Sequence, residues 1–146
     1  MDKYILIDVS GSMAEKGKKT VVRYLVYAIQ GFLQSEYSEQ RVEMYLFGRE
    51  ITPYNIKIDF TGKADSRSLK KFLVDKGEAT VLLLGDGSYS DDIQKTFKAS
   101  GISMLAVMIG SDCNKAVLQK IAGRGNVYDA VDLSACLNRF MNLSKG

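Results

Sequence analysis

The segment "YILIDVSGSM" places three oxygen-bearing side chains, Asp8, Ser10 and Ser12, at alternate positions directly after a run of apolar residues. A second apolar run, "TVLLLGDG", ends with Asp86 between two glycines. Carboxylate and hydroxyl oxygens, with no imidazole or thiol beside them, are the ligands that hard divalent cations such as Mg²⁺, Mn²⁺ or Ca²⁺ prefer. Two carboxylates and two hydroxyls do not fill such a shell. We therefore expect water, or a ligand from another molecule, to complete it.

Apolar runs and helical patterns alternate along the chain and predict the elements that position these oxygens. Short apolar runs typical of buried strands cover residues 3–10, 41–48, 80–87 and 103–110, with a weaker one at 126–132. Helical patterns cover residues 20–36, 66–76, 91–100, 114–123 and 133–143. The alternation predicts an α/β fold with a doubly wound, mostly parallel, six-stranded sheet and helices on both faces.

Residues 51–60 break this alternation, because they follow the strand at 41–48 without a helix between them. We interpret them as one antiparallel strand at the sheet edge, where Pro53 is tolerated. A single domain, residues 1–146, accounts for the whole pattern. Ligands bind such sheets beyond the carboxyl ends of the strands. Asp8 and Asp86 should therefore meet there, near the surface, if their strands are neighbours.

The composition limits the possible functions. The chain contains no histidine, which excludes catalysis of the Ser-His-Asp or Cys-His type. Cys113 and Cys136 are far apart and inside helical patterns, so we expect reduced core thiols. A net charge of only +3, with no strand of basic residues and exposed aromatics, argues against nucleic-acid binding. The apolar runs are far shorter than the roughly 20 residues of a membrane span. The start "MDKY" is unlike a secretory signal, so we expect a cytoplasmic protein that does not contact a membrane.

The polar residues also have purely structural interpretations. Asp8 could turn the chain, and Ser12 could cap the helix that follows. Ser90 is expected to cap a helix. Asp112 is interpreted first as a helix cap and only second as a residue behind the cation ligands. Two loops of this kind, each at the end of an apolar run, favour a cation site over a turn for Asp8 and Asp86.

The segment "DVSGSM" resembles the D-x-S-x-S motif of von Willebrand factor type A (vWA) domains, in the form common in their bacterial and intracellular members. The segment "LLLGDGSYSD" is similar to the second signature of that family, and the order of predicted elements follows the family pattern over nearly the whole chain. The resemblance implies the Rossmann-like vWA fold. It also implies a metal-ion-dependent adhesion site (MIDAS) that holds Mg²⁺, or Mn²⁺ or Ca²⁺ in its place.

By this resemblance, Ser10 and Ser12 would ligate the ion directly, and Asp8 and Asp86 would act directly or through water. The family has a further ligand, a threonine in the loop before the next helix. The corresponding loop here is "FTGKADSRSL", which has no threonine at the aligned place. Thr61 comes early, and Ala64 aligns best. The resemblance therefore leaves Asp65 and Ser66 as possible substitutes.

The resemblance also implies a function, which is non-catalytic capture of an acidic residue on a partner protein. That residue, an Asp or Glu, would complete the shell of the ion. The partner could be an ATPase or another protein encoded nearby. Lys16 and Lys18 would draw acidic ligands toward the site, and Tyr89 could be an exposed anchor for the partner.

One alternative function remains open from the residues themselves. Asp8 could attack a phosphate held by the cation and by Lys18 or Lys19, in a metal-dependent phosphoryl-transfer enzyme similar to a phosphatase. The familiar aspartyl-phosphate hydrolases carry a second aspartate two positions after the nucleophile. Ser10 occupies that position here, which favours the interaction module.

Overall fold

The computed structural model describes residues 2–143. Its strands are β1 (Asp2–Asp8), β2 (Val42–Phe47), β3 (Ile51–Pro53), β4 (Ala79–Gly85), β5 (Ser103–Met108) and β6 (Val127–Tyr128). Its helices are α1 (Lys18–Glu36), α2 (Ser66–Lys76), α3 (Asp91–Ser100), α4 (Lys115–Ala122) and α5 (Leu133–Asn142). Short 3-10 turns occupy Gly11–Ala14, Arg124–Asn126 and Ala130–Asp132. The predicted elements are all present, in the predicted order.

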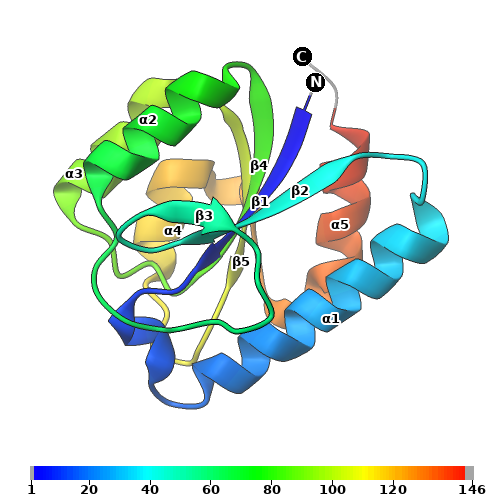
Figure 1. Cartoon of the computed structure of the whole chain (residues 1–146), viewed down its shortest axis with the longest axis horizontal. Helices are drawn as coiled ribbons and strands as arrows, with labels where there is room; N and C mark the ends of the chain where they lie inside the picture. The colour runs from blue at the N-terminus through cyan, green and yellow to red at the C-terminus, as the bar shows by residue number, and fades with distance from the viewer. Residues whose placement is uncertain (1, 144–146) are drawn as a thin grey trace.

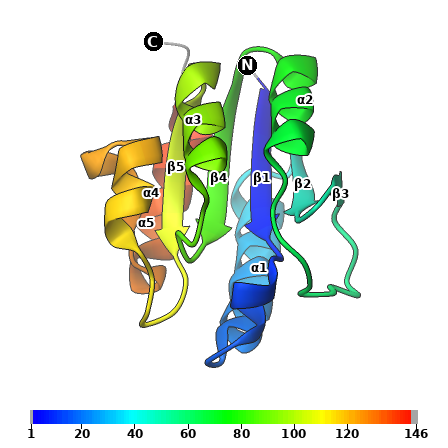
Figure 2. The ribbon, with the colours of Figure 1, turned by 90° about the vertical axis from the view of Figure 1, so that its left-hand side faces the viewer.

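The six strands form one sheet with the order β3-β2-β1-β4-β5-β6 (Figure 1). β1 lies in the middle and pairs in parallel with both β2 and β4. The chain therefore winds outward from β1 in one direction and from β4 in the other, and the strand order reverses between these two strands. Their carboxyl ends point to the same edge of the sheet, above the turn that leads into α1 (Figure 2). This is the edge at which such sheets bind ligands.

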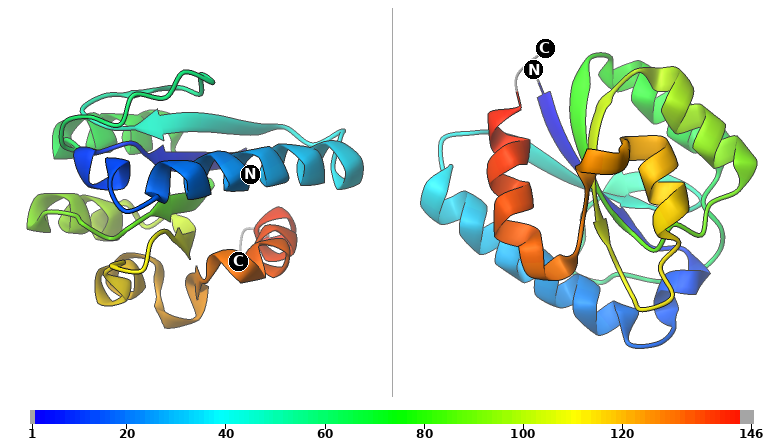
Figure 3. Two further views of the ribbon diagram at one scale, coloured as in Figure 1. Left: turned by 90° about the horizontal axis from the view of Figure 1, so that it is seen from below. Right: turned by 180° about the vertical axis from the view of Figure 1, so that it is seen from behind.

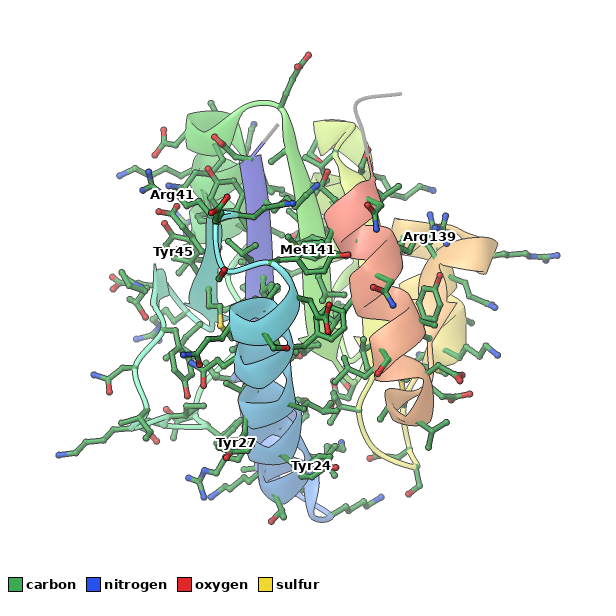
Figure 4. The ribbon with its side chains drawn as sticks, turned by 90° about the vertical axis from the view of Figure 1, so that its right-hand side faces the viewer. Tyr24, Tyr27, Arg41, Tyr45, Arg139 and Met141 are labelled. Atoms are coloured by element: carbon green, nitrogen blue, oxygen red, sulfur yellow. The ribbon has the colours of Figure 1, made fainter. Side chains whose placement is uncertain are left out.

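Helices cover both faces of the sheet, as the alternating pattern predicts (Figure 3). α1 and α5 lie on one face (Figure 4). Their apolar side chains belong to the same buried cluster as Ile5 and Ile7 of β1. α2, α3 and α4 cover the other face and pack against Tyr4 and Leu6. Successive residues of β1 thus point to opposite cores, because side chains alternate along a strand. Both faces are apolar, which explains the continuous apolar runs.

The edge segment is shorter than predicted. β3 pairs antiparallel with β2, as expected, but the paired residues are Ile51–Pro53 alone. The chain from residue 54 to residue 65 is instead a long loop that reaches the turn after β1, where the Gly11 amide donates a 2.9 Å hydrogen bond to the Gly62 carbonyl. The loop therefore forms one side of the candidate site.

The two cysteines lie in different settings. Cys136 is buried within α5, as predicted, whereas Cys113 lies in the loop before α4 and not in a helix. Within residues 2–143, no helix is both long and apolar enough to cross a membrane.

Candidate functional site

Three loops meet at the carboxyl edge of the sheet. One follows β1, one follows β4 and one follows β5. Ile7 of β1 pairs with Leu84 of β4, so the two strands are neighbours, a pairing that the sequence left open. Asp8 ends β1, and Asp86 directly follows β4. The loop after β5 joins them, because the Asn114 amide donates to the Asp86 carbonyl at 2.8 Å. The expectation that both carboxylates lie near the surface is wrong: Asp8 and Asp86 have no exposed surface.

The Asp8 carboxylate is only partly satisfied by hydrogen bonds. Its Oδ1 accepts from the Ser10 amide at 2.9 Å and from the Ser10 hydroxyl at 2.6 Å. Its Oδ2 is buried and makes no hydrogen bond of ordinary geometry among the described residues, and the same is true of the Tyr89 hydroxyl, which lies with it against Gly85. Burial raises the pKa of Asp8 to about 6, although the two bonds from Ser10 act in the opposite direction. Two buried polar atoms without a hydrogen bond, the carboxylate oxygen and the tyrosine hydroxyl, are unusual and require an explanation.

The serine hydroxyls predicted as ligands lie together. Ser10 Oγ and Ser12 Oγ are 3.3 Å apart, and both residues line a groove of about 430 Å³. The other walls of this groove come from residues 62–64 and 88–90. The groove therefore lies between the loop after β1, the loop after β4 and the long loop of residues 54–65.

The predicted substitutes for the missing threonine are not brought to the groove. Ala64 lines it, as the alignment of the loop predicts, but Thr61, Asp65 and Ser66 do not. Thr61 is exposed, and the Asp65 carboxylate caps α2 by accepting from the Arg67 amide at 3.0 Å. Within the described chain, no group of three or more His, Cys, Asp or Glu side chains is arranged to hold a metal ion. Any cation held here would therefore depend on hydroxyls as well as carboxylates.

Tyr89 is not an exposed anchor, and that prediction is wrong. Its side chain is 8% exposed, and its ring packs against Phe47 and Phe97 at centroid distances of 6.1 and 6.5 Å. Burial, followed by the charge of Asp8, raises the pKa of Tyr89 well above its usual value. Tyr89 is therefore a mostly buried residue that packs on Phe47 and Phe97 and also lines the groove.

The prediction for Lys18 is also wrong, because this residue is not a surface charge. Its side chain is 2% exposed, and its ammonium group lies 3.0 Å from Asp86 Oδ2 and 2.9 Å from Asp112 Oδ1. It also donates to the Ser12 carbonyl at 3.2 Å. Burial opposes the charge, but the hydrogen bonds to Asp112 and Asp86 outweigh it and raise the pKa of Lys18. The edge of the sheet thus contains a buried ammonium group.

The helix pattern contains a signal for this burial. Lys18 precedes Val22 by four residues, so it continues the stripe of α1 that faces the core. Gly110, at φ +89°, leaves room for the lysine stem, since a Cβ atom there would lie 2.6 Å from Lys18 Cε. Lys16 and Gly17, both at positive φ, form the turn that starts α1. This position on the core-facing stripe was not used to predict burial of Lys18, because lysine is almost never fully buried unless it is paired.

Asp112 does not cap a helix, which corrects the first interpretation of this residue. Asn114 caps α4 instead, by accepting from the Val117 amide at 3.2 Å. Asp112 pairs with Lys18, and the exposed Lys16 approaches it at 3.5 Å. The hydrogen bond from Lys18 lowers the pKa of Asp112. Ser90, in contrast, caps α3 as predicted, by accepting from the Ile93 amide.

Gly85 offers a test of how tightly the site is packed. A Cβ atom there would collide with the Tyr89 hydroxyl and lie 3.3 Å from Asp8 Oδ2. We expect Gly85→Ala to lower the free energy of unfolding by about 1–3 kcal/mol in urea titrations, because the crowded strand cannot give way. Gly31→Ala is the matched control: Gly31 is in the exposed part of α1 with open space around it. The control should gain about 0.5–1 kcal/mol. Equal stability of the wild type and Gly85→Ala would mean that Tyr89 moves freely.

The sequence matches no protein-family model and no curated protein. The structure is nevertheless similar to solved structures. An aerotolerance-related membrane protein from Bacteroides fragilis superposes with a TM-score of 0.70 at 14% identity, over 98% of this chain and 100% of that one. Manganese-loaded TRAP from Plasmodium vivax gives a TM-score of 0.68 at 17% identity, over 97% of this chain and 73% of that one.

A von Willebrand factor type A protein from Catenulispora acidiphila gives a TM-score of 0.61 at 16% identity. The match covers 94% of this chain and 40% of that one. These identities are low, so the likeness bears on the fold alone. Together with the sheet order and the antiparallel edge strand, it shows that the chain has the fold of a vWA domain.

Proposed function

We propose that this protein is a non-catalytic interaction module that binds a divalent cation at the Asp8, Ser10 and Ser12 loop and captures a carboxylate of a partner protein. The observation that carries the proposal is the fully buried Asp8 carboxylate, whose Oδ2 and the neighbouring Tyr89 hydroxyl both lack a hydrogen bond of ordinary geometry among the described residues. The pair of serine hydroxyls 3.3 Å apart adds the neutral oxygens that a hard cation prefers. Manganese in the structurally similar TRAP protein supports the same kind of site.

The residues of the site fit such a cation in their chemistry. Ser10 and Ser12 supply two hydroxyls that line the groove, and the buried Asp8 carboxylate is hydrogen-bonded to Ser10. Asp86 would be a fourth ligand, although its Oδ2 is paired with Lys18 and its Oδ1 accepts from the Ser88 amide at 3.0 Å. A bound ion, Mg²⁺ in our proposal, would supply positive charge for a partner carboxylate to neutralise. The partner could be an ATPase or another protein encoded nearby.

Lys16 and Lys63 extend this proposal to the surface. Lys16 is exposed beside the site, and Lys63 lines the groove. Positive side chains at the mouth of a groove raise the local concentration of anionic ligands. An acidic segment of a partner therefore suits this surface better than a neutral or basic one.

Phosphoryl transfer by Asp8 is the weaker candidate. The carboxylate is fully buried, and its Oδ1 is engaged twice by Ser10. A nucleophile must approach the phosphorus atom of its substrate, which a buried group held in this way does poorly. We propose that the protein does not turn over phosphoesters in the presence of Mg²⁺.

Metal titration tests the proposed function. The affinity for Mn²⁺ is measured from the electron paramagnetic resonance signal of the free ion, which is lost on binding. This affinity should fall at least about tenfold in Ser12→Ala, because a neutral ligand oxygen is lost. Ser35→Ala, an exposed serine near the far end of α1, is the matched control and should bind Mn²⁺ as the wild type does. The absence of Mn²⁺ binding to the wild type would contradict the proposal.

The same titration tests carboxylate capture. If acetate shares the shell of the cation, it should raise the affinity for Mn²⁺, and Mn²⁺ must raise the affinity for acetate by the same factor. We expect this reciprocal effect in the wild type and its loss in Ser12→Ala. Equal Mn²⁺ affinities with and without acetate, in a protein that binds Mn²⁺, would rule out a shared shell.

A further inference from the structure

The position beside Asp86 already holds a cation that belongs to the chain. Lys18 Nζ lies 3.0 Å from Asp86 Oδ2, and it also contacts both oxygens of Asp112, at 2.9 and 3.1 Å. Its remaining contact is the Ser12 carbonyl at 3.2 Å, in the same loop that carries the proposed metal ligands. The ammonium group is thus surrounded by oxygen atoms from all three loops of the site, much as a small cation would be.

The surrounding structure is built to accept this side chain. Gly110 has a positive φ and no Cβ atom, which leaves the path for the lysine stem between the end of β5 and α1. With Lys18 2% exposed and Asp86 fully buried, the pair is shielded from water. Shielded charges interact more strongly than exposed ones, so this contact is not a casual surface pair.

We propose that Lys18 is a built-in cation of this site, and that an external divalent ion can use Asp86 only by displacing the ammonium group. The inference rests on the proposed function, because it concerns the same cation. The physical reason is repulsion. Two positive groups that share one carboxylate in a buried place raise each other's energy, and the lysine cannot leave the site entirely because it is tethered.

Asp112 gives the displaced ammonium group a place to go. It is 36% exposed, and it already shares Lys18 with Asp86. Lys18 can therefore leave Asp86, stay paired with Asp112 and move toward solvent. A divalent ion would then gain a second carboxylate. The affinity for the ion depends on the free-energy difference between two arrangements: Lys18 paired with Asp86, and the ion on Asp86 with Lys18 displaced toward Asp112. The wild type should therefore bind divalent ions weakly.

The first test compares Mn²⁺ affinity in the wild type and in Lys18→Met, which keeps the length of the side chain and removes its charge. We expect at least about tenfold tighter binding in Lys18→Met, because Asp86 is then free for the ion. Lys19→Met is the matched control, since Lys19 is exposed on the next position of α1, and it should change the affinity little. Mn²⁺ should also raise the melting temperature of Lys18→Met more than that of the wild type.

The second test uses the wild-type protein, so that it does not depend on the folding of a variant. Lysines are acetylated briefly with and without saturating Mn²⁺, and the modified positions are identified by mass spectrometry. We expect Lys18 to be protected without Mn²⁺ and modified with it, whereas Lys19 reacts equally in both samples.

The outcomes separate this inference from the proposed function. If Mn²⁺ binds the wild type and Lys18→Met equally well, and Lys18 stays protected when the ion is bound, the inference is overturned while the metal site stands. If neither protein binds Mn²⁺, the proposed function fails, and the inference fails with it.

Discussion

Lys18→Met should lower the free energy of unfolding by about 3–5 kcal/mol in a buffer that contains EDTA, because it leaves the buried Asp86 carboxylate without its charge partner. This is the largest stability effect that we expect from a single substitution in the protein. The cause is not lost packing, because methionine keeps most of the lysine stem. Chemical denaturation with urea, followed by circular dichroism, measures the change directly.

A double-mutant cycle identifies the source of this loss. Asp86→Asn in the Lys18→Met background removes the buried charge, and it leaves an oxygen to accept from the Ser88 amide. We expect the double variant to recover a large part of the stability that Lys18→Met loses, because the penalty of the unpaired carboxylate disappears. A double variant no more stable than Lys18→Met would show that the ammonium group stabilises the fold through Ser12 and Asp112 instead.

The fold could be predicted from the sequence because each element carries its own local signal. The strands are apolar on both faces, and the helices show a clear core-facing stripe, as in α1. Gly101, in the left-handed conformation, ends α3, as a glycine after the last helical residue commonly does. Segment 51–60 was predicted too long, because its alternating apolar residues resemble a strand. β2 offers it pairing partners for three residues only, and the chain then turns toward Gly11.

The site was less predictable, because burial depends on contacts between distant segments. The sequence indicates that Asp8 and Asp86 lie at the same edge of the sheet, and the pairing of β1 with β4 makes their strands neighbours. It does not show that the loop after β5 brings Asp112 to Lys18, where it pairs with the buried ammonium group. Tyr89 was misjudged for the same reason. Its ring is buried by packing against Phe47 and Phe97, which belong to other elements.

The stability of the wild type in EDTA should fall as the pH rises from about 4 to about 6, relative to Asp8→Asn, because of the raised pKa of Asp8. In the unfolded chain this carboxyl loses its proton near pH 3.8, whereas in the folded protein it keeps the proton until about pH 6. Between these values the folded state binds more protons than the unfolded state, and a rising pH therefore favours unfolding. Below this range the carboxyl is protonated in both the folded and the unfolded state, so it does not lower the free energy of unfolding.

The size of this effect follows from the separation of the two pKa values. A difference of about two pH units corresponds to roughly 3 kcal/mol, which is the extra stability that we expect in Asp8→Asn at neutral pH. The asparagine can still accept from the Ser10 amide and hydroxyl through its own oxygen, so the turn after β1 is retained. Asp59→Asn, in the exposed part of the long loop, is the matched control for the exchange of an acid for an amide.

A divalent ion should reverse the order of these two proteins. Mg²⁺ binds the ionised form of Asp8, so saturating Mg²⁺ should stabilise the wild type and leave Asp8→Asn nearly unchanged. The comparison therefore needs four unfolding curves at neutral pH: each protein with EDTA and each with Mg²⁺.

If the difference between the proteins in EDTA is the same at about pH 4 as at neutral pH, the ionised carboxylate is well stabilised without a metal ion. The unpartnered Oδ2 would then have no need of a cation, and the main support for the metal site would be lost.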